Sequence, residues 1–158
     1  MNKRGVSPVI ATVLLIGIVI ALALIVFLWF KSFTQEAVTK FGGENIQLVC
    51  SDAKFNAGYS GGGELDLSNT GNVPIYSFNL KAVSTQGSYQ TTDLSQLFGN
   101  WPISGLNQGG TFSGNIGSLI SGTTTQIIII PILRGTTSSG TQESFTCPDQ
   151  YGQTISLS

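Results

Sequence analysis

Histidine is absent from this 158-residue sequence, and charged residues make up only 9% of it. A typical globular domain carries about 25% charged residues. Without histidine the chain has no Ser–His or Cys–His catalytic pair and no histidine-ligated metal site. Cysteine is also scarce, and Cys50 and Cys147 alone are too few to hold a metal ion. We therefore expect no enzyme activity, no cofactor and no metal site.

Charged side chains are also too few to bind nucleic acid and too widely spaced to bind calcium. From Ser32 onward four basic residues face eight acidic ones, so the chain lacks the positive charge that binding to nucleic acid requires. Calcium loops need clustered oxygen ligands, and the aspartates are spread along the chain (Asp52, Asp66, Asp93, Asp149). Gly61-Gly62-Gly63 is not followed by Gly-Lys-Ser/Thr, which excludes a phosphate-binding loop. A catalytic pair of carboxylates is the enzyme site that these absences leave open.

The front of the chain is an apolar run of 25 residues without a charge, from Val6 to Phe30. As a helix it spans roughly 38 Å, enough to cross a hydrocarbon core of about 30 Å. A secretory signal peptide is the alternative, but its apolar region is about 7–15 residues long and ends in a small-residue cleavage motif. This run is longer and has no such motif. Lys3 and Arg4 precede it and predict a cytoplasmic N-terminus, with everything after the helix outside the membrane.

Two features of this segment predict how the helix begins and what it contacts. Ser7-Pro8 is a helix-start signature, with serine as N-cap and proline at the first position. Gly17 and Ala21 lie four residues apart and favour close approach of a neighbouring helix, although small residues are common in such helices by chance.

Helical spacing of apolar residues extends beyond the run, and it predicts one continuous helix that ends at Gly42-Gly43. The residues that recur at intervals of three and four are Phe30, Phe33, Ala37 and Phe41.

The order of residues from Lys3 to Leu15, Lys-Arg-Gly-Val-Ser-Pro-Val-Ile-Ala-Thr-Val-Leu-Leu, resembles the N-terminal region of archaeal type IV pilins. In that family a prepilin peptidase removes a short basic leader ending in glycine or alanine, and a Val-Ser-Pro-Val-Ile string follows. The resemblance extends to about Phe30 and implies cleavage between Gly5 and Val6. It also implies a subunit that is stored in the membrane and then self-assembles into a filament, with the peptidase and the assembly machinery as partners. Bacterial relatives have a glutamate where this chain has Ile10, but archaeal members commonly lack it.

From Glu44 the hydrophobic period changes from 3.6 to 2, which predicts strands. The predicted strands are Ile46 to Cys50, Glu64 to Ser68, Tyr76 to Ala82, Ile127 to Ile130 closed by Pro131, Phe145 to Cys147, and Ile155 to Leu157. Strands at this spacing, with turn signals between them, are typical of an antiparallel sandwich. The expected fold is α+β: a leader at residues 1–5, a hydrophobic assembly or transmembrane helix at 6–43, and an extracellular immunoglobulin-like β-sandwich at 44–158.

The long segment from Ser84 to Gly122 is rich in glycine, serine and glutamine. We interpret it as loops with one or two weak strands, in which Phe98 and Trp101 cover the core rather than bind a ligand.

Cys50 and Cys147 both follow the apolar run and therefore lie in an oxidising exterior. Because they are the only two cysteines and both fall in predicted strands, we expect them to form a disulfide. The bridge closes a loop of about 100 residues and is worth up to about 4.7 kcal/mol in the chain-entropy model. The alternative is two buried free thiols, since cysteine is among the most buried residue types.

The sequence thus predicts the structural subunit of an archaeal type IV pilus-like filament on the cell surface, with adhesion as the role of the β-rich part. Two other hypotheses stay open: a single-pass anchored binding module that does not polymerise, and a minor pilin at a filament tip. The sequence separates these three poorly, because assembly helices and anchor helices have the same composition.

Overall fold

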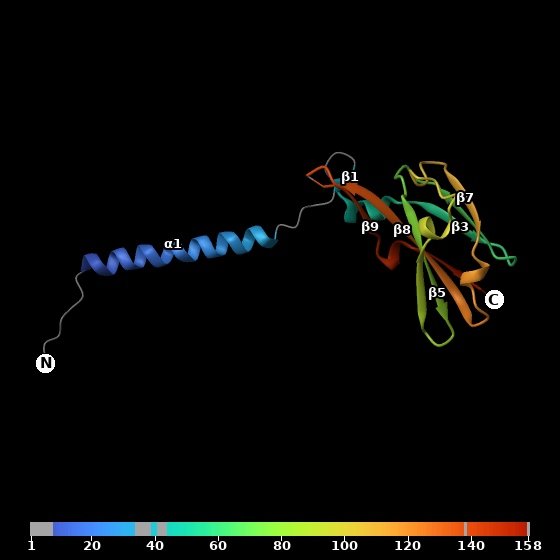
Figure 1. Ribbon diagram of the computed structural model, residues 1–158, viewed down its shortest axis with the longest axis horizontal. Coiled ribbons are helices and arrows are strands. Elements are labelled where there is room, and N and C mark those ends of the chain that lie inside the picture. The colour runs from blue at the N-terminus through green and yellow to red at the C-terminus, as the bar shows by residue number, and fades with distance from the viewer. Residues whose placement is uncertain (1–7, 34–38, 41–43, 138, 158) are drawn as a thin grey trace. The chain divides into compact units, whose positions relative to one another are not determined.

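The computed structural model describes residues 8–33, 39–40, 44–137 and 139–157. The chain divides into two compact units, Met1–Ala37 and Val38–Ser158. The first unit contains a single described helix, and the second, which we call the head, contains antiparallel β-sheets (Figure 1). The fold class is therefore α+β, as the sequence predicts.

Helix α1, Pro8–Phe33, forms the described part of the first unit. It begins at Pro8, where a proline costs nothing because the first N–H of a helix has no partner within the helix. Ser7, the predicted N-cap, lies outside the described residues. Its 21-residue segment Pro8–Leu28 is long and apolar enough to cross a membrane.

The predicted continuation of this helix to Phe41 is wrong at Thr39 and Lys40, which form strand β1 (Thr39–Lys40) of the head. Thr39 pairs with Asn45 of β2 (Glu44–Asn45) and with Thr136 of the long strand β8. A β-branched residue favours the extended backbone, and two neighbouring strands supply backbone partners that a solvent-exposed helix end does not have. Residues 34–38 and 41–43, the rest of the predicted continuation, lie outside the described residues.

Strand β8 is the centre of the larger sheet, which has seven strands among the described residues, in the order β2-β1-β8-β5-β6 with β9 and β10 also on β8. Every pairing in it is antiparallel. The bounds not yet given are β5 Ser77–Ser84, β6 Tyr89–Asp93, β8 Thr124–Thr136, β9 Gln142–Thr146 and β10 Gln153–Ser156. Short helical turns connect some of these strands: α3 Leu94–Leu97, η2 Gly117–Leu119 and η3 Asp149–Tyr151.

The smaller sheet has three antiparallel strands in the order β3-β4-β7. Its strands are β3 Phe55–Tyr59, β4 Glu64–Asn69 and β7 Thr111–Asn115. The alternation predicted in β4 is confirmed, because Leu65 and Leu67 are buried while Glu64 and Asp66 are exposed. The sequence predicts one or two weak strands between Ser84 and Gly122, and the structure has two there, β6 and β7.

Buried side chains from both sheets form one hydrophobic cluster. Phe55 of β3 and Phe78 of β5 bring their ring centroids to 4.9 Å, and Trp101 lies 4.6 Å from Phe112 of β7. The Trp101 indole N–H donates to the Tyr76 carbonyl at 2.9 Å, so its polar end is satisfied. Trp101 and Phe98 are thus part of or packed against the core, as predicted.

The first predicted strand is wrong. Ile46 to Cys50 is not a strand but helix α2 (Ile46–Val49) followed by η1 (Cys50–Asp52). The Asn45 side chain caps α2 by accepting from the Gln47 N–H at 2.9 Å. Ile46 and Val49, three residues apart, are buried, while Leu48 is exposed. The apparent alternation is therefore one helical turn.

Pro131 does not close its strand, since β8 continues through it to Thr136. Its carbonyl accepts from the Cys147 N–H at 3.0 Å, on the side of β8 where β9 has ended and β10 has not begun. In an antiparallel strand the N and C=O of one residue point to the same side. The Pro131 nitrogen therefore also points into the gap between β9 and β10, where no strand needs its missing N–H.

Candidate functional site: the apolar helix and the root of the head

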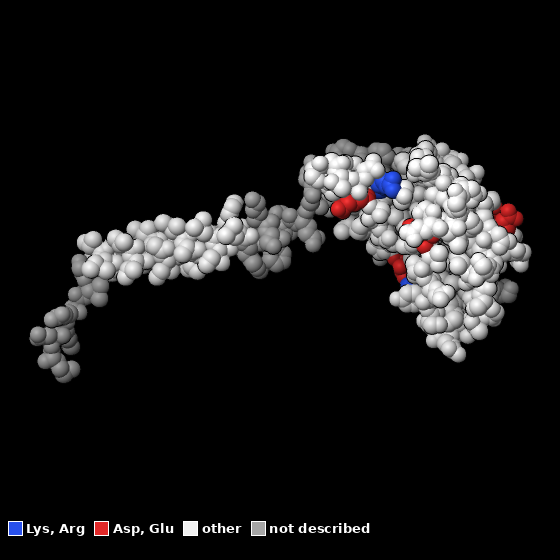
Figure 2. Space-filling view, in the orientation of Figure 1, with Lys and Arg blue, Asp and Glu red and all other residues white. Residues whose placement is uncertain are grey.

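Helix α1 exposes apolar side chains on every side. Its large hydrophobic residues between Val9 and Leu28 are each 55–68% exposed. A helix that is apolar all round is found inside a protein core or a membrane rather than in water. Figure 2 shows no charged residue on the described surface of this helix. The helix therefore needs a dry environment that its own chain does not supply.

The segment Pro8–Leu28 has no unpaired polar side chain whose transfer into a dry environment would cost free energy. Thr12 is its single polar side chain, and its hydroxyl donates to the Val9 carbonyl at 2.9 Å. Gly17 has open space around it, so nothing described in the chain itself requires a glycine there. A span of 21 residues, Pro8–Leu28, is about 32 Å long, which matches a hydrocarbon core of about 30 Å.

The predicted cleavage position lies close to the first described residue of α1. Gly5 and Val6 themselves are outside the described residues, so cleavage between them stays a prediction. The α1 start at Pro8 is three residues from Gly5 in the sequence.

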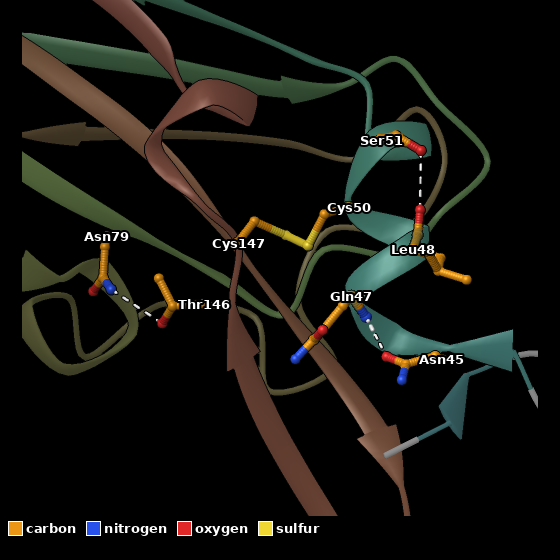
Figure 3. Close-up of a disulfide and its surroundings, with 8 residues drawn as sticks. All are labelled: Asn45, Gln47, Leu48, Cys50, Ser51, Asn79, Thr146 and Cys147. Carbon is orange, nitrogen blue, oxygen red and sulfur yellow. Dashed lines mark hydrogen bonds between the residues drawn. A yellow bond between two sulfur atoms is a disulfide. The ribbon is translucent and has the colours of Figure 1, made fainter. Parts of the chain in front are cut away.

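The predicted disulfide is present between Cys50 of η1 and Cys147, which directly follows β9 (Figure 3). The two Cα atoms are 5.7 Å apart, and both residues are almost fully buried, at 0% and 2% exposure. The bridge joins the root of the head, by which we mean residues 39–40 and 44–52, to the corner between β9 and β10. It therefore ties the chain's entry into the head to the larger sheet by a covalent bond.

A second tie joins the edges of the two sheets without a covalent bond. The Gln153 side-chain amide on β10 donates to the Ala57 carbonyl and accepts from the Ala57 N–H, each at 2.9 Å. One side chain therefore pairs with both backbone groups of an edge residue in β3, as a neighbouring strand would do. An edge strand with unpaired groups invites aggregation, and this amide covers part of that edge.

The head has few charged side chains, and most of them form no ion pair with another described residue. Lys81 Nζ lies 2.7 Å from an Asp149 carboxylate oxygen and 4.3 Å from the centroid of the Tyr89 ring. The hydrogen bond from Lys81 to Asp149 raises the pKa of Lys81 above its ordinary value of 10.5. Among the described residues this is the single ion pair, and no described group of three or more His, Cys, Asp or Glu residues could hold a metal ion.

Arg134 lies at a site that the sequence did not predict. Its guanidinium carbon is 3.5 Å from the centroid of the Tyr76 ring, in a surface hollow of about 350 Å³. Other residues that line the hollow include Pro74, Ser104, Thr136 and Gln142. Tyr76 and Arg134 are 58 positions apart in the sequence, and their contact depends on how the β5 and β8 ends align, which residue spacing does not reveal.

No family model and no curated protein matches this chain. Among solved structures, one match is titled "X-ray structure of Northeast Structural Genomics Consortium target SoR45". It is 9% identical, with 69% of this chain and 89% of that chain covered, and its TM-score is 0.36. A likeness of this size carries no argument about fold or function, so the proposal below depends on the chain's own residues.

Proposed function

We propose that this chain is the structural subunit of an archaeal type IV pilus-like surface filament, which polymerises through α1 and displays the head outside the cell. The observation that carries the proposal is the contrast within one chain: the span Pro8–Leu28 has no charge and leaves its large apolar side chains more than half exposed, whereas the head has its own buried core. The order of residues from Lys3 to Leu15 supports the same proposal.

The helix has the properties that storage in a membrane and later assembly require. Moving it from lipid into a bundle of identical helices exchanges one dry, apolar environment for another, so packing between helices decides the balance. Lys3 and Arg4 oppose that transfer because charges are costly in a dry core. Removal of the leader between Gly5 and Val6 takes both charges away and permits extraction from the membrane.

The proposal also takes the head to be an antiparallel β-sandwich of the immunoglobulin-like kind. The support is the single buried cluster shared by the three-stranded and the seven-stranded sheet. The contact of Phe55 with Phe78 and the Gln153–Ala57 pairing join the two sheets at the core and at one edge. Such a head is suited to adhesion because it folds independently of the polymer.

The test is expression of the full chain with an archaeal prepilin peptidase and the pilus assembly machinery. We expect surface filaments under the electron microscope, with this chain as their main protein and Val6 as its first residue by peptide mapping. Gly5→Ala should still be cut, since the family accepts alanine there, whereas Gly5→Trp should leave the precursor in the membrane. If the processed chain from Val6 to Ser158 stays dispersed in the membrane, the chain is a single-pass anchored module and not a pilin.

A further inference from the structure

Arg134 is a cation that is held in place by an aromatic ring and has no counter-ion among the described residues. Its guanidinium is stacked on Tyr76 and partly buried. Arg134 forms no ion pair with any described residue, Glu143 on the adjacent strand included. A guanidinium held over a ring leaves N–H groups at its edge, and that edge can bind a carboxylate through two hydrogen bonds.

The hollow around Arg134 has room for a carboxylate and polar groups near it. Its volume is about 350 Å³, and Ser104 and Gln142 supply a hydroxyl and an amide to the lining. These groups pair with the oxygens of an acid and do not compete with it as a charged neighbour would. The hollow therefore has the chemistry of a carboxylate site.

The hollow lies at the root end of the head. Thr136, which lines it, pairs with Thr39 of β1, where the chain enters the head. Arg134 is two residues earlier on β8.

An exposed acidic residue without a described partner lies at the opposite end of the head. Glu64 is the first residue of β4, and the preceding Gly63 carbonyl accepts from Ile116, just before η2 and the start of β8. In Figure 1 the turn between β3 and β4 lies on the far side of the head from β1. Glu64 makes no side-chain ion pair or hydrogen bond with a described residue, whereas the nearby Asp66 accepts from Ser113.

We infer that the Arg134–Tyr76 hollow of one copy receives the Glu64 carboxylate of a neighbouring copy in the filament. The two groups have opposite charge, form no ion pair with a described residue of their own copy, and lie at opposite ends of the head. A contact between different ends of identical subunits repeats from copy to copy, and it continues along a filament when its rotation does not close into a ring. The inference depends on the proposed function and names the contact between heads that accompanies the helix bundle.

Charge reversal tests the contact in purified filaments of the full chain. Arg134→Glu and Glu64→Arg should each raise the rate at which subunits leave the filament about tenfold, which corresponds to about 1.4 kcal/mol. The double variant, Arg134→Glu with Glu64→Arg, should return the rate to within about threefold of the unaltered chain, since the pair is re-formed with its charges exchanged. Lys54→Glu makes the same charge change at an exposed lysine outside the hollow and should leave the rate unchanged.

A crosslink tests the geometry independently of stability. Glu64→Cys together with Ser104→Cys should give a ladder of covalent oligomers from filaments on a non-reducing gel, because Ser104 lines the hollow. Glu64→Cys together with Gln90→Cys, on the outer strand β6, should give no ladder.

Each result decides between the two proposals. Absence of filaments from the unaltered chain overturns the proposed function and this contact together. Filaments that form but do not respond to either charge reversal, or a double variant no better than the worse single variant, overturn the contact alone. An effect of Arg134→Glu without an effect of Glu64→Arg overturns Glu64 as the occupant.

Discussion

Helix α1 exposes its apolar side chains, whereas the head buries them. Between Val9 and Leu28 the helix leaves every large hydrophobic residue more than half exposed, whereas the head encloses Leu65, Phe78 and Ile129 almost completely. The hydrogen bonds of an α-helix are local, while the head depends on pairings between strands far apart in the sequence. The helix therefore satisfies its backbone hydrogen bonds but leaves its apolar side chains exposed. The head pairs its strands and also buries its apolar core.

The largest effect expected from this contrast is at the centre of α1. Ile20→Lys places a charge that costs about 2.5–3.5 kcal/mol in a dry helix interior on insertion scales, and it should abolish filaments. The melting temperature of the head should stay the same, because Ile20 lies in the other unit. Electron microscopy and calorimetry of the same preparation measure both. Ile20→Leu is the matched control, and filaments that survive the lysine would contradict a dry helix bundle.

The next largest effect concerns the stability of the head. Cys50→Ser with Cys147→Ser removes a bridge across 97 residues, and it should lower the free energy of unfolding by up to about 4.7 kcal/mol. Urea unfolding followed by tryptophan fluorescence measures this. The helix content of α1 should not change. Reduced, unaltered protein should reproduce the loss, and equal stability of the two redox states would count against the bridge as a major stabiliser.

A smaller effect is expected at the edge between the two sheets. Gln153→Leu leaves the N–H and C=O of Ala57 without their side-chain partner, which should cost about 1–3 kcal/mol. The urea midpoint should fall accordingly. Gln150→Leu introduces the same side chain at an exposed position with no described hydrogen bond and serves as the control. A shift of equal size in both variants would show a general effect of leucine on the surface.

The smallest effect concerns Lys81. Its pKa is raised by the hydrogen bond to Asp149, so the folded state binds the proton more tightly than the unfolded state does. The resulting stability is fully present below pH 10.5 and is lost as the pH rises through the raised pKa. Lys81→Met should therefore lower stability slightly at neutral pH and remove the alkaline loss, so that the two chains converge in stability above the raised pKa of Lys81. A pH series of urea midpoints measures this, and identical alkaline curves for both chains would contradict it.

The sequence predicts those features of this fold that depend on short-range patterns. Alternation of Leu65 and Leu67 is enough to predict β4, and the absence of charge from Val6 to Phe30 is enough to predict α1. The pairing of Cys50 with Cys147 follows from there being no other cysteine. In each case one physical constraint acts alone, and no competing interaction from elsewhere in the fold opposes it.

The predictions fail where a local signal competes with a distant one. Asn45 caps a helical turn, so the alternation from Ile46 to Cys50 is misleading as a strand pattern. Thr39 leaves the predicted helix because β8 supplies a partner almost 100 residues away. The hollow at Arg134 could not be predicted, because residue spacing gives neither the alignment of β8 with β5 nor the position of Tyr76.

The disulfide also determines how a pulled subunit extends. When α1 is held and the load is borne by β10, tension enters the head at Thr39 and leaves after Cys147. With the bridge intact, the chain from residue 39 to residue 49 can reach a total length of at most about 40 Å before the sulfur atoms carry the load. Without it, the stretch from Cys50 to Cys147, a sequence separation of 97, would add roughly 330 Å of chain length. The bridge thus makes the head a short, stiff link between its anchor and its last strand.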